Sequence, residues 1–298
     1  MAGLLQRVKA KMFIFAHRKN LNLLDGGYVS VFRGRSLDFD DLRSYVPGDE
    51  VRDIDWKATA RHGSPLVKRY TAGRRHSVLL LVDTGRTMAA EAASGEAKVE
   101  IAVGAAGVLG YLACRHGDDV GLLHGSEGAT RFLPPRGGEH HLERLLQEVN
   151  SAVSAQGPAS ALSRQLDYAL RFLKGRVLVV GVADEFMPDP GTREQLRRLV
   201  ARHEVLWLTI RDADLVAEGT ASGSMDVGTG QNLPPAVASD PKVRSAYARA
   251  MRLREEERRD VFRSLGIAEE QTESSSGVVQ AVFALLEKHK GGRSRRAG

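Results

Sequence analysis

Ser77-Val-Leu-Leu-Leu-Val-Asp83 is the stretch of sequence that decides the fold. Its five central residues are apolar without alternation, which is typical of a strand that is buried on both faces of a sheet. Arg176-Val-Leu-Val-Val-Gly-Val-Ala-Asp184 repeats the pattern, an apolar run that ends in an aspartate. Because such strands need helices on both sides, the two stretches predict an α/β fold with an open, mostly parallel sheet.

Apolar runs and helical patterns alternate through the rest of the chain. Further strands are expected at 119–124, 130–133, 203–212 and 265–272, and helices at 96–116, 139–153, 161–174, 191–202, 241–265 and 278–288. Residues 213–240 are rich in Gly, Ser and Pro and are too long for an ordinary connection. This stretch therefore predicts a loop or hairpin excursion.

The patterning divides the chain into four predicted parts. Residues 1–25 contain an amphipathic helix that is expected to dock on the sheet domain. Residues 26–75 form an irregular module, rich in Gly, Asp and Arg, which is expected to pack on the same domain. The sheet domain itself spans 76–290, and 291–298 are expected to be a disordered basic tail.

The net charge of +6 raises the question of nucleic-acid binding. Five basic residues lie within the last eleven positions: Lys288, Lys290, Arg293, Arg295 and Arg296. The rest of the chain has 38 basic residues against 37 acidic ones. A folded body this close to neutral argues against nucleic acid as a partner.

Hydropathy and cysteine content restrict where the protein works. The longest apolar runs are far shorter than the ~20 residues that span a bilayer, so no membrane span is expected. The amino-terminal residues lack the pattern of a signal peptide. Cys114 is the single cysteine, which forbids an internal disulfide and favours a reducing, cytoplasmic location.

Oxygen-bearing side chains follow the two strands that end in aspartate. Asp83 and Thr87 come after the first strand, Asp184 ends the second, and Ser160 precedes the helix between them. In an open parallel sheet, such residues meet beyond the carboxyl ends of the strands. Carboxylate and hydroxyl oxygens suit Mg²⁺ or Mn²⁺, so these four residues are the candidate metal ligands. We expect Asp83 to be a solvated carboxylate at this edge.

The Asp83-x-Gly85-x-Thr87 segment resembles the Asp-x-Ser-x-Ser loop of von Willebrand factor A-like domains. In those domains the loop belongs to a metal-ion-dependent adhesion site, where Ser160 resembles the second-loop Thr and Asp184 the third-loop Asp. Gly85 replaces a Ser ligand, so the resemblance implies a degenerate, weak Mg²⁺ or Mn²⁺ site that Gly85→Ser would strengthen. Arg86 and Met88 flank the loop and are candidate partner contacts.

A longer motif lies upstream, in Arg43-Ser-Tyr-Val-Pro-Gly-Asp-Glu-Val-Arg-Asp-Ile-Asp-Trp56. It closely resembles the signature of the prokaryotic domain of unknown function 58 family, whose members place this segment before a von Willebrand A-like (Rossmann-like) domain. The resemblance extends from Tyr28 to the final helix and supports the predicted fold. Acidic and basic residues alternate in the motif, which favours internal ion pairs that brace the module. A partner-binding surface around Tyr45 and Trp56 is the alternative.

The resemblance implies a noncatalytic adaptor. Members of the family are commonly encoded beside MoxR-type AAA+ ATPases and are thought to assist the assembly or maturation of other proteins. A MoxR-type ATPase, its client protein or both are therefore the expected partners. The chain lacks a Gly-x-x-x-x-Gly-Lys-[Ser/Thr] segment, so it has no P-loop of its own. The alternative is a metal-dependent hydrolase that uses Asp83 and Asp184, with His124 as the candidate base.

Overall fold

The computed structural model describes residues 3–18, 28, 39–46, 54–70, 76–214, 225–232 and 240–294. Its centre is a six-stranded sheet in the order β10-β7-β6-β3-β4-β5. The strands are β3 (Ser77–Asp83), β4 (Asp119–Gly125), β5 (Thr130–Arg136), β6 (Leu178–Ala183), β7 (Glu204–Ile210) and β10 (Ala268–Thr272). All neighbouring pairs are parallel except β4 and β5, so the predicted mostly parallel α/β sheet is confirmed.

The strand order fixes where a site can form. Counted along the chain, the six strands follow the doubly wound order 3-2-1-4-5-6. The winding reverses between β3 and β6, so the connections leave their carboxyl ends in opposite directions. This switch point is the usual ligand-binding position in such sheets, and Asp83 and Asp184 lie at it.

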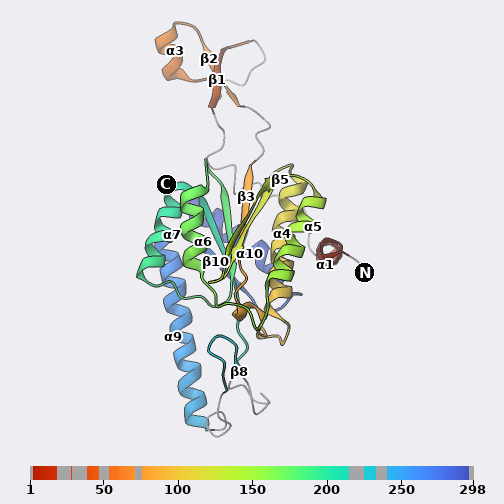
Figure 1. Cartoon of the computed structure of the whole chain (residues 1–298). Helices are drawn as coiled ribbons and strands as arrows, with labels where there is room; N and C mark the ends of the chain where they lie inside the picture. Colours follow the sequence, from red (N-terminus) through yellow and green to blue (C-terminus); the bar gives the residue numbers. More distant parts are fainter. Residues whose placement is uncertain are drawn as a thin grey trace.

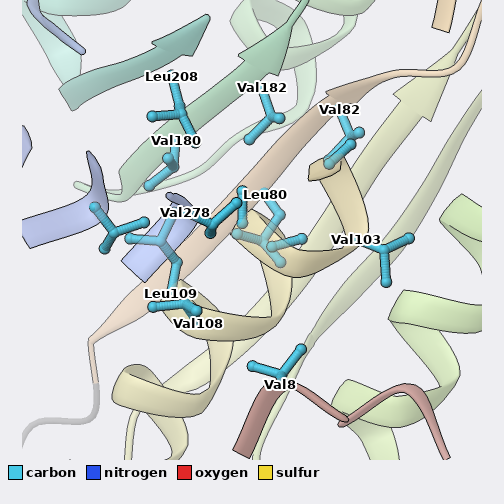
Figure 2. Packing of buried hydrophobic residues seen from close by; sticks show 14 of the residues in the cluster. Val8, Leu80, Val82, Val103, Val108, Leu109, Val180, Val182, Leu208 and Val278 are labelled. Carbon is cyan, nitrogen blue, oxygen red and sulfur yellow. The ribbon is translucent and has the colours of Figure 1, made fainter. Parts of the chain in front are cut away.

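Helices cover both faces of the sheet (Figure 1). On one side lie α1 (Leu4–Arg18), α4 (Lys98–Arg115), α5 (Glu139–Ala152) and α10 (Val278–Ser294), and on the other α6 (Leu162–Phe172), α7 (Pro190–Arg202) and α9 (Pro241–Leu265). Strand β3 contributes Val78, Leu80 and Val82 to the first core and Leu79 and Leu81 to the second. Figure 2 shows Leu80 and Val82 among the side chains of α4 and β6. Alternate residues of a single buried strand therefore supply both cores.

Helix α1 docks on α4 and α5, as expected. Leu5, Val8 and Met12 are buried in the first core, and Figure 2 shows Val8 facing α4. The Glu143 carboxylate accepts hydrogen bonds from the backbone N–H groups of Leu4 (3.0 Å) and Leu5 (2.7 Å). A side chain of α5 thus satisfies donors at the first turn of α1, which have no partner within the helix.

Strand β5, which lies at one edge of the sheet, extends three residues beyond its predicted end at residue 133. The run contains Pro134 and Pro135, which led to the shorter prediction. Proline cannot donate a ladder hydrogen bond, but it is tolerated in an edge strand. Among the described residues, strand β5 pairs only with β4, and a register shift between Val120 and Leu122 lies beside the prolines.

The amino-terminal module has an architecture of its own, with β1 (Phe39–Ser44) antiparallel to β2 (Leu66–Tyr70) and α3 (Trp56–His62) between them. The Asp55 side chain caps α3 by accepting from the N–H groups of Lys57 and Ala58, both at 3.0 Å. Leu66 and Val67 are buried but belong to neither core of the sheet domain.

This unit does not pack on the sheet domain as expected. Figure 1 shows β1, α3 and β2 beyond the amino ends of the parallel strands, standing away from the sheet. Tyr28, by contrast, is buried in the sheet domain, where its hydroxyl donates to Asp118 (2.7 Å) and its ring stacks on His116. The predicted ion pairs of residues 47–53 lie outside the described residues.

Two further expectations concern the carboxyl-terminal third. Within the 213–240 stretch, predicted as a loop or hairpin excursion, the described residues form a hairpin of β8 (Met225–Asp226) and β9 (Gln231–Asn232). Helix α10 continues to Ser294, so a tail that starts at residue 291 was wrong, and 295–298 lie outside the described residues. Within the described ranges, no helix is both long and apolar enough to cross a bilayer.

Close packing between β6 and β7 gives a test of the second core. A Cβ atom on Gly181 would lie 2.2 Å from Cε3 of the buried Trp207 ring. Gly181→Ala should therefore lower the free energy of unfolding by about 1–3 kcal/mol, because the indole cannot move without disturbing the core. Denaturant unfolding measures the change.

The control is Gly104→Ala in α4, where the new Cβ would be in ordinary contact, 3.7 Å from Val278. This variant should be neutral or stabilised by up to about 1 kcal/mol through helix propensity. Equal effects of the two substitutions would contradict the packing described.

Candidate functional site

The candidate site lies where β3, β6 and β7 end at the carboxyl edge of the sheet. Figure 1 shows that the loop before α4 and the β8–β9 hairpin lie at this same end, opposite the β1–α3–β2 unit. Backbone hydrogen bonds fix the loop before α4 to the end of β7. Ala92 forms an antiparallel bridge with Asp212, and the N–H of Ala93 donates to the carbonyl of Arg211 (3.1 Å). The edge therefore has a defined shape.

Asp83 is fully buried and not solvated as expected. Its Oδ1 accepts from the N–H of Gly85 at 2.9 Å. Its Oδ2 is buried and has no hydrogen-bond partner among the described residues. Burial and, next, the neighbouring Asp184 carboxylate raise the pKa of this carboxyl to about 6, a net value that includes the lowering effects of Ser160, Gly85 and Lys98. The carboxylate is therefore costly to ionise.

Two loops bring the predicted hydroxyl groups together. The Oγ1 of Thr87 and the Oγ of Ser160 are 2.8 Å apart and share a hydrogen bond. The loops are joined by the backbone as well, because the N–H of Arg86 donates to the carbonyl of Pro158 (2.9 Å). Thr87 and Ser160 thus meet beside Asp83, as the sequence predicts.

Gly85 is needed for this approach of the loops. A Cβ atom on Gly85 would lie 2.4 Å from both the backbone N and Cα of Ser160. No side chain fits there unless the 158–160 loop moves. The expectation that Gly85→Ser would strengthen a metal site stays a prediction, and this close approach opposes it, because the serine would push apart the hydroxyl groups it was meant to join.

Lys98, the first residue of α4, is the site residue that sequence reasoning missed. Its side chain is 2% exposed, and its Nζ lies 3.5 Å from Oδ2 of Asp184 and in close contact with Oδ1 of Asp212. Asp212 lies just after the end of β7, in the same way that Asp83 is the last residue of β3 and Asp184 comes directly after β6. The available signal was a lysine at the start of an otherwise largely apolar helix and a third strand that ends near an aspartate.

These residues do not fit a tightly held divalent cation. Asp184, a predicted ligand, contacts an ammonium group, and the hydroxyls of Thr87 and Ser160 bond to each other. The described parts of the chain also contain no cluster of three or more His, Cys, Asp or Glu side chains arranged to hold a metal. Weak Mg²⁺ or Mn²⁺ binding through Asp83, Thr87, Ser160 and Asp184 stays a prediction.

The structure separates the predicted partner contacts. Met88 is fully buried, so its assignment as a contact was wrong; its side chain belongs to the first core. Arg86 is half-buried beside the site. Trp56 is 65% exposed at the start of α3, and Tyr45 is half-buried after β1. Figure 1 shows α3 and β1, the elements next to these two residues, at the opposite end of the molecule from the carboxyl end of β3.

His124, the candidate base of the hydrolase alternative, is buried in β4. Its Nδ1 lies 3.3 Å from Oγ1 of Thr84 and its Nε2 3.5 Å from the Glu148 carboxylate. Burial lowers its pKa. These contacts turn the ring toward α5, and they supply no observation in favour of hydrolysis at Asp83 and Asp184.

The β8–β9 hairpin reaches this edge. A Cβ atom on Gly228, at its tip, would lie 3.5 Å from Cγ2 of Thr87. The Asp226 carboxylate shapes the turn by accepting from the N–H of Gly228 and the hydroxyl of Thr229, both at 2.8 Å. The hairpin therefore packs beside Thr87 and covers part of the loop.

Comparison with protein families gives one match that extends over most of the chain. The model of the protein of unknown function DUF58 matches residues 41–257. The chain belongs to the DUF58 family. The match includes the β1–α3–β2 unit, the sheet through β7 and most of α9. As predicted, this DUF58 protein has a mostly parallel α/β sheet with helices on both faces.

The comparisons also give similar proteins and structures from several bacteria. The uncharacterized protein Rv1480 of Mycobacterium tuberculosis is 29% identical over 240 residues, which cover 76% of this chain and 72% of that protein. An aerotolerance-related membrane protein from Bacteroides fragilis is similar in structure, with a TM-score of 0.48 and 16% identity over 72% of this chain and 99% of that one. A von Willebrand factor type A protein from Catenulispora acidiphila gives a TM-score of 0.42 and 10% identity, with 74% and 43% covered.

Asp83→Asn should change how the stability of this DUF58 protein depends on pH. The folded pKa of about 6 lies above the ordinary value of 3.8, so between these values the folded state binds more protons than the unfolded state. The contribution of Asp83 to stability is therefore lost as pH rises through this window. Asparagine does not titrate, so the variant should gain up to about 3 kcal/mol on the parent between pH of about 4 and 7.

Denaturant unfolding at a series of pH values measures this difference. Asp167→Asn, which removes an exposed carboxylate of α6, is the matched control and should follow the parent. Parallel curves for Asp83→Asn and the parent would contradict the burial of a strained carboxylate at this position.

Proposed function

We propose that this protein is a noncatalytic adaptor that binds another protein through the carboxyl edge of its sheet. The expected partner is a MoxR-type AAA+ ATPase, its client or both, with assembly or maturation of other proteins as the outcome. The resemblance to the family motif implies the ATPase, and the edge itself supports protein binding.

The observation that carries the proposal is the fixed, polar surface of the edge. Backbone hydrogen bonds hold its loops, from Arg86 to Pro158, from Glu127 to Ala159 (2.8 Å) and from Ser94 to Glu273 (3.3 Å). A surface that is already ordered loses little conformational freedom on binding. Residues 93–95 lie exposed on it, between the buried cluster and solvent.

The polar side chains of the site, of which Asp83 and Lys98 are buried and the others half-buried, are occupied with one another. Thr87 bonds to Ser160, Asp83 to Gly85, and Lys98 to Asp184 and Asp212. Such a network holds loops in place but offers a substrate few free groups, which favours recognition over catalysis.

The same substitution at the two ends of the molecule tests which surface binds. Ala93→Arg adds a long charged side chain to the exposed loop before α4, and Ala60→Arg adds it to the exposed face of α3. We expect Ala93→Arg to weaken binding of the purified MoxR-type ATPase from the same organism by about tenfold or more. Ala60→Arg should bind like the parent, and both variants should keep the parent's melting temperature.

Titration calorimetry or biolayer interferometry measures these affinities. Loss of binding in Ala60→Arg alone would move the surface to the region of Tyr45 and Trp56. A parent that does not bind the ATPase would contradict the proposed partner. Hydrolysis of a phosphoester by the parent, lost in Asp184→Ala, would favour the hydrolase alternative.

A further inference from the structure

We propose that the ammonium group of Lys98 supplies the positive charge of the strand-end site, in the place where a von Willebrand A-like domain would hold a divalent cation. This inference concerns the inside of the site and does not depend on what the edge binds. It rests on the position of Lys98 among the aspartates that end three neighbouring strands.

The fold delivers the ammonium to this position through the start of α4. Lys98 begins the helix, and its backbone N–H donates to the carbonyl of Ala90 (3.0 Å), which anchors the end of the preceding loop. The side chain is almost completely buried and ends at Asp184 and Asp212. A lysine is rarely buried to this extent unless its charge is paired.

The carboxylates need such a cation. Asp83, Asp184 and Asp212 end β3, β6 and β7, which are neighbours in the sheet, so three negative charges converge at one edge. Asp83 is fully buried and its Oδ2 has no hydrogen-bond partner among the described residues. Without a positive charge nearby, these groups would repel one another in a region of low dielectric constant.

A divalent ion would compete directly with Lys98. Asp184 resembles a metal ligand by position, and here its Oδ2 faces the ammonium. A metal bound by Asp83 and Asp184 would lie next to a buried positive charge. The absence of a side chain at Gly85, where Ser160 leaves no room, removes a further ligand. Both features lower the affinity for Mg²⁺, and the charge of Lys98 is the one that a substitution can remove.

Lys98→Met tests the proposal, since it keeps an unbranched side chain of similar length and removes the charge. In the parent, Mg²⁺ and EDTA should leave the melting temperature unchanged. In Lys98→Met, MgCl₂ should raise the melting temperature, and calorimetry should show Mg²⁺ affinity about tenfold or more above the parent's. Lys98→Met/Asp184→Asn should lose this gain, because it lacks a carboxylate that would hold the ion.

Lys9→Met is the matched control, because Lys9 lies on α1, away from the cluster, and pairs there with Glu139 of α5. It should bind Mg²⁺ no better than the parent. The proposal is overturned if folded Lys98→Met gains no affinity for Mg²⁺, or if the parent binds Mg²⁺ tightly.

If Lys98→Met does not fold, Lys98→Met/Asp212→Asn takes its place, because it removes one charge of each sign. Charge balance predicts that this pair folds, as judged by near-ultraviolet circular dichroism, and failure to fold even with MgCl₂ would overturn the proposal. These experiments use the purified protein alone, so their outcome is separate from that of the adaptor test.

Discussion

Burial of the central sheet on both faces is the constraint on which the rest of the structure depends. Strand β3 has no face left for water, so its residues alternate between two separate cores. Full burial of each Leu or Val side chain contributes about 1.5–3 kcal/mol, and this requires a helix layer on either side. Gly181 shows how tightly this face of the sheet is filled, because its missing side chain makes room for the ring of Trp207 on the neighbouring strand β7.

The same burial explains the electrostatics of the strand ends. A strand that runs through the interior can end on an aspartate that water does not reach, and Asp83 is the result. The loops then have to satisfy charge from within the chain, by backbone N–H groups, hydroxyls and the ammonium of Lys98. On the opposite face of the sheet, the buried side chains of Arg258 and Glu269 pair in a similar way at 3.0 Å. The Glu269 carboxylate also accepts a hydrogen bond from the hydroxyl of Thr209. Such pairs set positions more than they add stability.

Local patterns predicted the fold well, and long-range contacts account for what they missed. The buried strands of the sheet have apolar runs and the helices around it have helical periodicity, so the expected order agrees with the structure from β3 onward, whereas β1, α3 and β2 were not predicted. The four candidate ligands were found because parallel strands share one carboxyl edge. Lys98 was missed because nothing near it in the sequence indicates that its side chain reaches Asp184 and Asp212. Met88 was misjudged for the same reason, since its burial depends on packing between distant segments.

The two prolines of β5 have a consequence for how copies of this protein can meet. A sheet edge with free N–H and C=O groups invites another strand, and self-association through such edges is a common route to aggregation. At β5, Pro134 and Pro135 offer no N–H groups, and Arg131 stands exposed beside them. The edge is thereby closed to further strand pairing along these residues. Extension of the sheet past Pro134 and Pro135 is therefore disfavoured, and contacts between copies at these residues fall to side chains.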